Sequence, residues 1–196
     1  MRLASDDFNR SDSGTLGSNW TKLSVYADLT ISNNRCASPT PMAGADAYTG
    51  KSEFPLDQYS QALVITVNKG GLTVRSNLAS TFYLFFEGTS NLANVYKVIG
   101  GASTLLSSVA HTWGGTEVAF IQVKGTAILT KVNGVVLNDF TDSAIDGVTV
   151  GGPYTGVYGE TPANEIWDDW EGGDLGLTRQ DFRGSRPRPF APGLAR

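Results

Sequence analysis

The chain has 196 residues, with 15 Lys and Arg against 19 Asp and Glu, which gives a net charge of −4 at neutral pH. This length suits one domain with a substantial core and leaves little room for two. The acidic balance disfavours nucleic acid as the main partner, and no apolar run approaches the ~20 residues of a membrane span. Met1–Asp6 lacks the apolar stretch of a signal peptide, so classical secretion is not expected.

Short apolar segments recur along the chain, and each is closed by turn residues. They predict β-strands over 62–67, 72–75, 82–86, 95–99, 104–106, 118–123, 128–132 and 135–137. Asn133-Gly134 joins the last two and supplies the two positive-φ positions of a type I′ hairpin turn. No apolar stripe has the 3.6-residue period of a helix, so very little helix is expected. About a dozen strands at this spacing predict an all-β, antiparallel two-sheet sandwich.

Both ends of the body carry recognisable motifs. Asp6–Asp12 reads DDFNRSD, Leu16–Trp20 reads LGSNW, and Ile166–Gly173 reads IWDDWEGG. In this order they resemble bacterial and phage domains of the concanavalin A-like lectin/glucanase superfamily, which are laminin G-like jelly rolls. The resemblance implies a jelly-roll domain over 1–174 whose first and last strands pair, so that 175–196 leaves the fold as an extended C-terminal arm.

The closing motif is the one place where carboxylates cluster. Glucanases of this superfamily use a Glu-x-Asp-x-x-Glu strand, but here Glu165, Asp168 and Glu171 have a spacing that is one residue longer. On an uninterrupted strand, Glu165 and Glu171 share one face and Asp168 points to the other. We expect an edge strand with Trp170 and Ile166 facing the core and the acids facing water, and no catalytic residue.

Metal and cofactor chemistry have little support in the sequence. His111 is the only histidine, and Cys36 has no second thiol or imidazole near it in sequence, so neither a transition-metal site nor a Cys/His catalytic pair is expected. Jelly rolls of this superfamily often bind a structural Ca²⁺ near the termini, where Asp7 and Asp169 can meet if the end strands pair. Calcium prefers six or more oxygen ligands, however, so we assign no metal and no cofactor.

Carbohydrate binding is the alternative that the sequence leaves open, because a sugar site needs aromatic faces beside polar groups. The aromatic residues in loop-like segments are Tyr48, Tyr59, Trp113, Tyr154 and Tyr158. Ordinary packing in the sandwich is the competing interpretation for each of them. Trp20 and Trp170 are assigned to the core.

The arm over 175–196 differs in composition from the rest. It holds five arginines and one aspartate, a net charge of +4, whereas 1–174 carries −8. Alone such a segment should be disordered, and ordering it costs ~20–40 kcal/mol, which a neighbouring molecule would have to supply. Charged, apolar and proline residues alternate in a pattern typical of an extended docking segment. The predicted partner-binding residues are Arg179, Phe182, Arg183, Arg186, Pro187, Arg188, Pro189 and Phe190.

Two functional hypotheses follow. The leading one is a non-enzymatic structural or decoration protein of a bacteriophage virion, anchored by the arm to a major capsid or tail protein and to copies of itself. The alternative is a carbohydrate-binding module that adheres to surface polysaccharide. Both can hold for one protein, because a decoration protein can also bind glycans.

Overall fold

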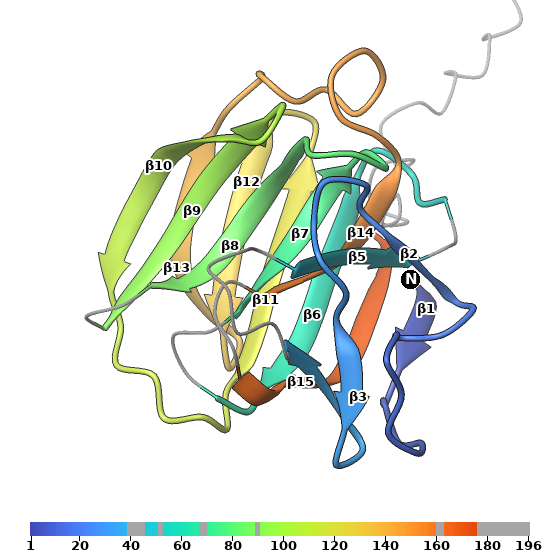
Figure 1. The fold of residues 1–196 in the computed structure, drawn as a ribbon. Helices are drawn as coiled ribbons and strands as arrows, with labels where there is room; N and C mark the ends of the chain where they lie inside the picture. The colour runs from blue at the N-terminus through green and yellow to red at the C-terminus, as the bar shows by residue number, and fades with distance from the viewer. Residues whose placement is uncertain (39–45, 51–52, 67–69, 89–90, 160–162, 176–196) are drawn as a thin grey trace, which may run out of the picture.

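The computed structural model describes residues 1–38, 46–50, 53–66, 70–88, 91–159 and 163–175; for 46–48, 86–88 and 163–165 it describes only the backbone. This part of the chain forms fifteen strands and contains no helix, hence none that could cross a membrane. The strands make two antiparallel sheets packed face to face (Figure 1). The predicted all-β jelly-roll sandwich is confirmed.

The first sheet has eight strands in the order β13-β12-β11-β6-β15-β4-β3, with β1 paired to β15. Their bounds are β1 (Arg2–Asp6), β3 (Thr30–Ser32), β4 (Arg35–Ser38), β6 (Gln58–Val64), β11 (Val118–Lys124), β12 (Ala127–Val132), β13 (Val135–Thr141) and β15 (Ala163–Asp174).

The second sheet has seven strands in the order β10-β9-β8-β7-β14-β5-β2. Their bounds are β2 (Trp20–Lys22), β5 (Asp46–Gly50), β7 (Gly70–Ser76), β8 (Phe82–Gly88), β9 (Leu92–Ile99), β10 (Ala102–Ala110) and β14 (Tyr154–Gly159).

The main core lies between the sheets and follows from the two-residue period of the strands. On β6, Ala62 and Val64 are fully buried, whereas Gln61 and Leu63, which alternate with them, are partly exposed on the outer face. Trp20 and Trp170 are buried in this core, as predicted. Burying each large apolar side chain contributes roughly 1.5–3 kcal/mol, which makes this layer the main source of stability.

A second, smaller core covers part of the outer face of the seven-stranded sheet. Phe82, Leu84 and Val98 are buried there together with Leu23, and Tyr26 packs against them. Leu23 and Tyr26 belong to the segment that follows β2, so this segment lies over the sheet and closes part of a face that would otherwise meet solvent.

The Asn133-Gly134 hairpin forms as the sequence predicts. Asn133 has φ 49° and Gly134 has φ 79°, and the turn joins β12 to β13. Both values are in the left-handed region that a type I′ turn requires.

Met1 and the end of β15 lie at one edge of the molecule because β1 and β15 pair. Ser5 faces Glu171 and Asp6 faces Trp170 in the antiparallel register, and the Met1 ammonium group donates a hydrogen bond to the Asp174 carbonyl. The predicted pairing of the first and last strands of the domain is confirmed.

Ile166 and Trp170 face the core as predicted, but the expected edge strand is wrong: β15 pairs with β6 on one side and with β4 and β1 on the other. The alternation expected along β15 is also wrong in its centre. Ile166 and Trp167 are adjacent and both fully buried, and Trp170 is buried three residues later. The pairing of β15 with β6 shifts register between Asp168 and Glu171, which is a β-bulge. The bulge adds one residue to β15. The two-residue alternation of side chains therefore no longer predicts which residues on either side of the bulge face the core.

Candidate functional site

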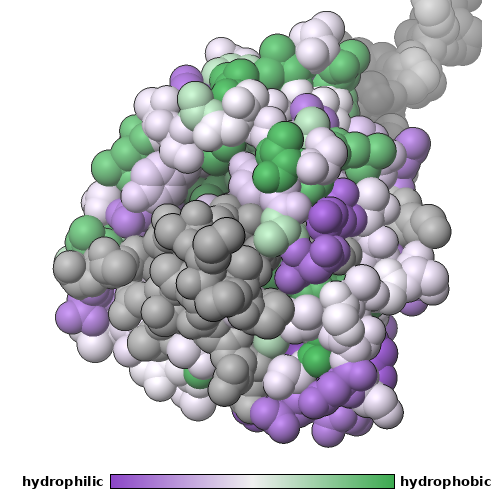
Figure 2. All heavy atoms as spheres, in the orientation of Figure 1, coloured by the Kyte–Doolittle hydropathy of each residue, from purple (hydrophilic) through white to green (hydrophobic). Residues whose placement is uncertain are grey.

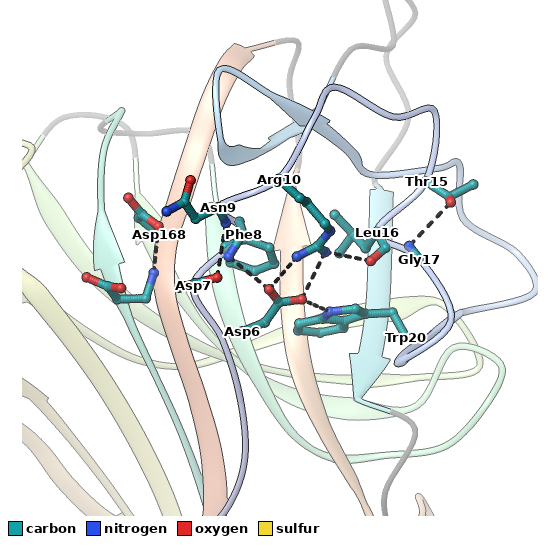
Figure 3. A network of polar contacts seen from close by, with 11 residues as sticks. Asp6, Asp7, Phe8, Asn9, Arg10, Thr15, Leu16, Gly17, Trp20 and Asp168 are labelled. Atoms are coloured by element: carbon teal, nitrogen blue, oxygen red, sulfur yellow. Dashed lines mark hydrogen bonds and ion pairs between the residues drawn. The ribbon is translucent and has the colours of Figure 1, made fainter.

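The opening motif builds a partly buried network of polar contacts around Asp6 (Figure 3). The Asp6 carboxylate accepts hydrogen bonds from Arg10 Nη1 (2.6 Å) and Nη2 (2.9 Å), the Phe8 amide (2.8 Å) and Trp20 Nε1 (2.6 Å). Arg10 Nη2 also donates to the Leu16 carbonyl at 2.6 Å. All five motif residues therefore hold one another, and we call this set the Asp6 clamp.

The clamp places bulky aromatic rings beside a strained backbone. Phe8 is fully buried although its φ is 51°, a conformation that a side chain with a Cβ rarely adopts. Its ring centroid lies 5.8 Å from that of Trp20, which in turn lies 4.6 Å from that of Trp170 on β15. The chain turn after β1 is therefore fixed from both sides, by the carboxylate and by the rings.

The β15 bulge lies opposite the Asp6 clamp, and the two face each other across a hollow described below. Asp169 is exposed with φ 47°, and its amide donates to Asp168 Oδ1 at 2.9 Å. Asp168 also lies 3.6 Å from Arg35 Nε on β4. Burial raises the pKa of Asp168, while the Asp169 amide and Arg35 act against this rise. The bulge thus turns Asp169 outward, away from the ladder.

Between the clamp and the bulge lies an open hollow of about 610 Å³, which we call the terminal groove. It is lined by Arg2, Ser5, Asp6, Asp7, Arg10, Asn19, Gln61, Asp169, Trp170 and Glu171. A second hollow of about 350 Å³ shares Asp7 and Asp169 with it and reaches the β3–β4 turn. Hydrophilic residues gather in the lower right of Figure 2, over the chain that follows β1 and the β3–β4 turn in Figure 1.

Several groove side chains have unused hydrogen-bonding capacity. The Arg2 side chain is 63% exposed and only 4.0 Å from Glu171 Oε2, a loose ion pair. Glu171 Oε1 accepts a hydrogen bond from Tyr59 Oη at 3.2 Å, and this carboxylate is 28% exposed. Burial, followed by the charge of Glu171, raises the pKa of Tyr59 to about 12. Tyr59 therefore stays a neutral donor that orients Glu171.

The described acidic residues of the groove do not form a metal site. Asp7 and Asp169 both line it, so the end strands bring these two acids to one place as expected. Within the described residues, however, no three His, Cys, Asp or Glu side chains gather closely enough to hold a metal ion.

The aromatic residues singled out from the sequence do not form one platform. Trp113 is 6% exposed, packs against Phe85 and donates from Nε1 to the Leu92 carbonyl at 3.1 Å. Tyr154 is partly buried at the start of β14. The Tyr48 backbone pairs with Val157, and its side chain is outside the described part.

Tyr158 belongs to the small outer core of the seven-stranded sheet. Its ring lies 6.1 Å from that of Tyr26 and 6.2 Å from that of Phe82. On the same face, Thr73 Oγ1 and Asn94 Oδ1 are buried with no hydrogen-bond partner. This face is therefore the rival location for a ligand, although Thr73 is 1% exposed and would need the cover to move.

The predicted partner-binding residues of the arm lie outside the described residues. They are Arg179, Phe182, Arg183, Arg186, Pro187, Arg188, Pro189 and Phe190. Their role stays a prediction. Leu175 is the last described residue, and its amide donates to the Asp57 carbonyl at 3.1 Å.

The end motifs contain most of the groove lining, but sequence reasoning used them as fold motifs and did not assign a site to them. Arg2, Ser5 and Gln61 lie outside these motifs, and none of the predicted sugar-site aromatics lines the groove. Gln61 enters because β6 lies next to β15, a contact between residues more than 100 positions apart. Its place on the outer face could be read from the alternation of β6, but the neighbouring strand could not.

Comparisons with known proteins give structural neighbours only. No family model matches the chain, and no curated protein matches it in sequence. Carbohydrate binding module CBM66 from Bacillus subtilis is similar with TM-score 0.56 and 15% identity, over 80% of this chain and 93% of that one. A Bacillus subtilis protein of unknown function with a galectin-like fold gives TM-score 0.59 and 9% identity, over 88% and 96%.

The lumenal domain of VIP36, in a form bound to Ca²⁺ and mannose, is similar with TM-score 0.52 and 8% identity, over 81% of this chain and 83% of that one. At these identities the likeness concerns the fold. The neighbours are lectin-type and galectin-like jelly rolls, which agrees with the concanavalin A-like resemblance of the end motifs. The phage context of that resemblance stays a prediction.

Proposed function

We propose that this chain is a carbohydrate-binding module and that the terminal groove binds a neutral glycan. The observation that carries the proposal is the groove itself, an open hollow of about 610 Å³ whose walls are almost entirely hydrogen-bonding side chains. The lining holds both donors and acceptors, because Arg2, Asn19 and Gln61 can donate and Asp169 and Glu171 can accept. Vicinal sugar hydroxyls, each a donor and an acceptor, match such a lining.

The charges of the groove favour a neutral ligand over an anionic one. Arg10 is committed to Asp6 in the clamp, and Arg2 lies beside Glu171. Asp7 and Asp169 add two further acids, so two cations stand against four anions in the lining. A sialylated, uronic or sulfated sugar would meet net negative charge, whereas neutral hydroxyls meet no such repulsion.

Structural neighbours support the same class of function. CBM66 is named as a carbohydrate-binding module, and the VIP36 domain is described with bound mannose. The groove is the place in this chain where we propose that such binding occurs. Its two walls are the Asp6 clamp and the β15 bulge, which are formed by the opening and closing motifs of the sequence.

The proposal is tested with the full chain on an array of neutral and anionic glycans, followed by calorimetry on the best neutral ligand. Asn19→Ala/Gln61→Ala should weaken binding at least about tenfold, because two polar contacts are lost. Gln122→Ala is the matched control, since Gln122 lies on the outer face of the neighbouring strand β11 and outside the groove lining. Circular dichroism verifies that each variant is folded.

Three results would contradict the proposal at different levels. No binding to any glycan would remove the function. A preference for anionic glycans would contradict the ligand class. Loss of binding in Asn94→Ala, with Asn19→Ala/Gln61→Ala unchanged, would keep carbohydrate binding and move the site to the outer face of the seven-stranded sheet.

The proposed activity is binding without bond cleavage. A structure associated with endo-acting O-glycanases of the human gut microbiota shares the fold, with TM-score 0.56 and 12% identity, over 90% of this chain and all of that one. Enzyme and binding modules therefore use one architecture, and only an assay separates them. We expect no release of reducing ends from β-glucans or mucin-type O-glycans.

A second proposal concerns the Arg/Pro-rich arm. Its charge of +4 against −8 in residues 1–174 favours docking on an acidic surface, and we propose that it anchors the module to a larger assembly such as a virion. Deleting 176–196 should abolish attachment to the particle and leave glycan binding unchanged. Normal occupancy of particles by the truncated protein would contradict the anchoring role.

A further inference from the structure

We infer that the terminal groove is the middle of a longer trough, which binds an internal segment of a linear neutral polysaccharide rather than a single sugar. The inference rests on the proposed function and specifies the length of its ligand. Its basis is the arrangement of three adjoining hollows at the edge where β1 and β15 pair.

The second hollow, of about 350 Å³, continues the groove toward the β3–β4 turn. Asp7 and Asp169 border both hollows, and both side chains are exposed. Beyond these two acids, the second hollow is lined by Asn9, Asn33, Asn34, Arg35 and Asp168. A sugar bound in the groove therefore has amide and carboxylate groups beside it that can bind the hydroxyls of the next sugar in a chain.

A third hollow, of about 260 Å³, continues the groove on its other side, toward β2. It shares Ser5, Asp6, Asn19 and Trp170 with the groove, but among the described residues it shares none with the second hollow. The groove therefore lies between the two. In Figure 1, β2 is above β1 and the β3–β4 turn is below it, so the trough follows the edge formed by β1. A polysaccharide can continue past the groove in both directions.

The wall of the second hollow is held in place by contacts within the chain. Asp12 Oδ1 accepts a hydrogen bond from the Asn33 amide at 2.9 Å. Ser13 and Ile31 exchange two backbone hydrogen bonds, of 3.1 and 2.9 Å. Asn33 and Asn34 have φ 51° and 60°, the left-handed conformation of a two-residue hairpin turn. The turn is thus tied to the chain that follows β1, and it loses little freedom when it binds a sugar.

The size of the trough also favours an oligosaccharide. A drug-sized ligand, comparable to a di- or trisaccharide, fills a pocket of roughly 300–1,000 Å³. The groove alone has about 610 Å³, and it is flanked by hollows of about 350 and 260 Å³. A single sugar would leave most of this space to water.

The charges of the second hollow match a neutral chain, as those of the groove do. In its described lining, three carboxylates stand against one cation, and Asp168 lies 3.6 Å from Arg35 Nε. A polysaccharide with an acid on each sugar would be repelled in both hollows.

Calorimetry of the full chain tests the inference with neutral gluco-, manno- and galacto-oligosaccharides, from the monosaccharide to the hexasaccharide. In a series that binds, the affinity should rise at least about tenfold from the mono- to the tetrasaccharide. Asn9→Ala/Asn34→Gly should remove most of this rise and leave the affinity for the monosaccharide unchanged, because only longer ligands reach the second hollow. Glycine keeps the left-handed backbone at position 34.

Asn133→Gly is the matched control. It makes the same substitution at a left-handed residue of a hairpin turn, but at the β13 end of the eight-stranded sheet, opposite the β3 end. This variant should bind every length of oligosaccharide as the unchanged chain does. Circular dichroism verifies that both variants are folded.

Stoichiometry tests whether the bound segment is internal. The number of modules bound per polysaccharide molecule should grow with the length of the polysaccharide, because a trough that is open at both ends binds anywhere along it. A module that recognises only chain ends would bind in a fixed number at every length.

The failure of this inference is separable from the failure of the proposed function. If no glycan binds at all, the proposed function is wrong. If sugars bind, a fixed number of modules per chain overturns the inference, and so does equal affinity for the mono- and tetrasaccharide. An unchanged length dependence in Asn9→Ala/Asn34→Gly, or an equal loss in Asn133→Gly, overturns it as well.

Discussion

The two lateral ends of the sandwich differ in strand length and in the density of charged side chains. At the end where β1 and β15 pair, the edge strands are short, charged side chains are dense, and Phe8 and Asp169 have left-handed backbone conformations. At the end formed by β10 and β13, the strands are long and hairpin turns are regular. One fold thus carries a polar, hollowed end and an end of long, regularly paired strands.

The largest expected difference between the two ends is in stability. Asp6→Ala should lower the free energy of unfolding by about 3 kcal/mol, because four donors around the carboxylate lose their acceptor and Arg10 loses its partner. Asp139→Ala, at the other end on exposed β13, should change it by less than about 0.5 kcal/mol. Urea denaturation of both variants measures this contrast. Equal effects would show that the clamp is not the stabilising feature of its end.

A smaller effect of opposite sign is expected at the bulge. Asp169→Gly should raise the free energy of unfolding by up to about 1 kcal/mol, because glycine adopts a φ of 47° without strain. The same change removes a carboxylate from the groove and should weaken glycan binding. Thermal denaturation and calorimetry on one sample measure both quantities. A variant that loses stability would mean that the Asp169 side chain makes contacts worth more than the strain.

The smallest expected effect concerns the titration of the Tyr59 hydroxyl, which lies beside Glu171 of the groove. Because the pKa of Tyr59 is raised to about 12 from the usual 10, the stability that this group contributes is complete below pH 10 and is lost as pH rises through about 12. Tyrosinate absorbance in a pH titration should therefore contain a component near 12 that Tyr59→Phe removes. Glu171→Gln should shift this component to lower pH. A titration of Tyr59 near 10 would show that burial and Glu171 do not act on it.

The end motifs gave the fold class because their residues act locally. Asp6, Phe8, Arg10 and Trp20 lie within fifteen positions of one another, so their spacing reflects a single turn of chain. The hairpin at Asn133-Gly134 was predictable for the same reason, since its conformation is decided by two residues.

The features that sequence reasoning missed depend on distant contacts. The β15 bulge at Asp168–Asp169 arises where β1, β4 and β6 all pair with one strand, and no local pattern encodes that competition. Trp113 sits in a loop-like sequence and yet is buried, because its indole N–H reaches the carbonyl of Leu92, about twenty residues earlier. A loop-like sequence around a residue indicates that the chain turns there, but it does not indicate that the side chain is exposed.

The contact between Met1 and Asp174 allows the strands of the domain to be connected in a different order along the chain. Because these residues lie side by side, a short peptide can join them and new ends can be opened at the Asn133-Gly134 turn without displacing a strand. The domain is therefore suited to circular permutation. A protein fused to the new ends at Asn133-Gly134 would then lie at the β12–β13 turn, away from the groove.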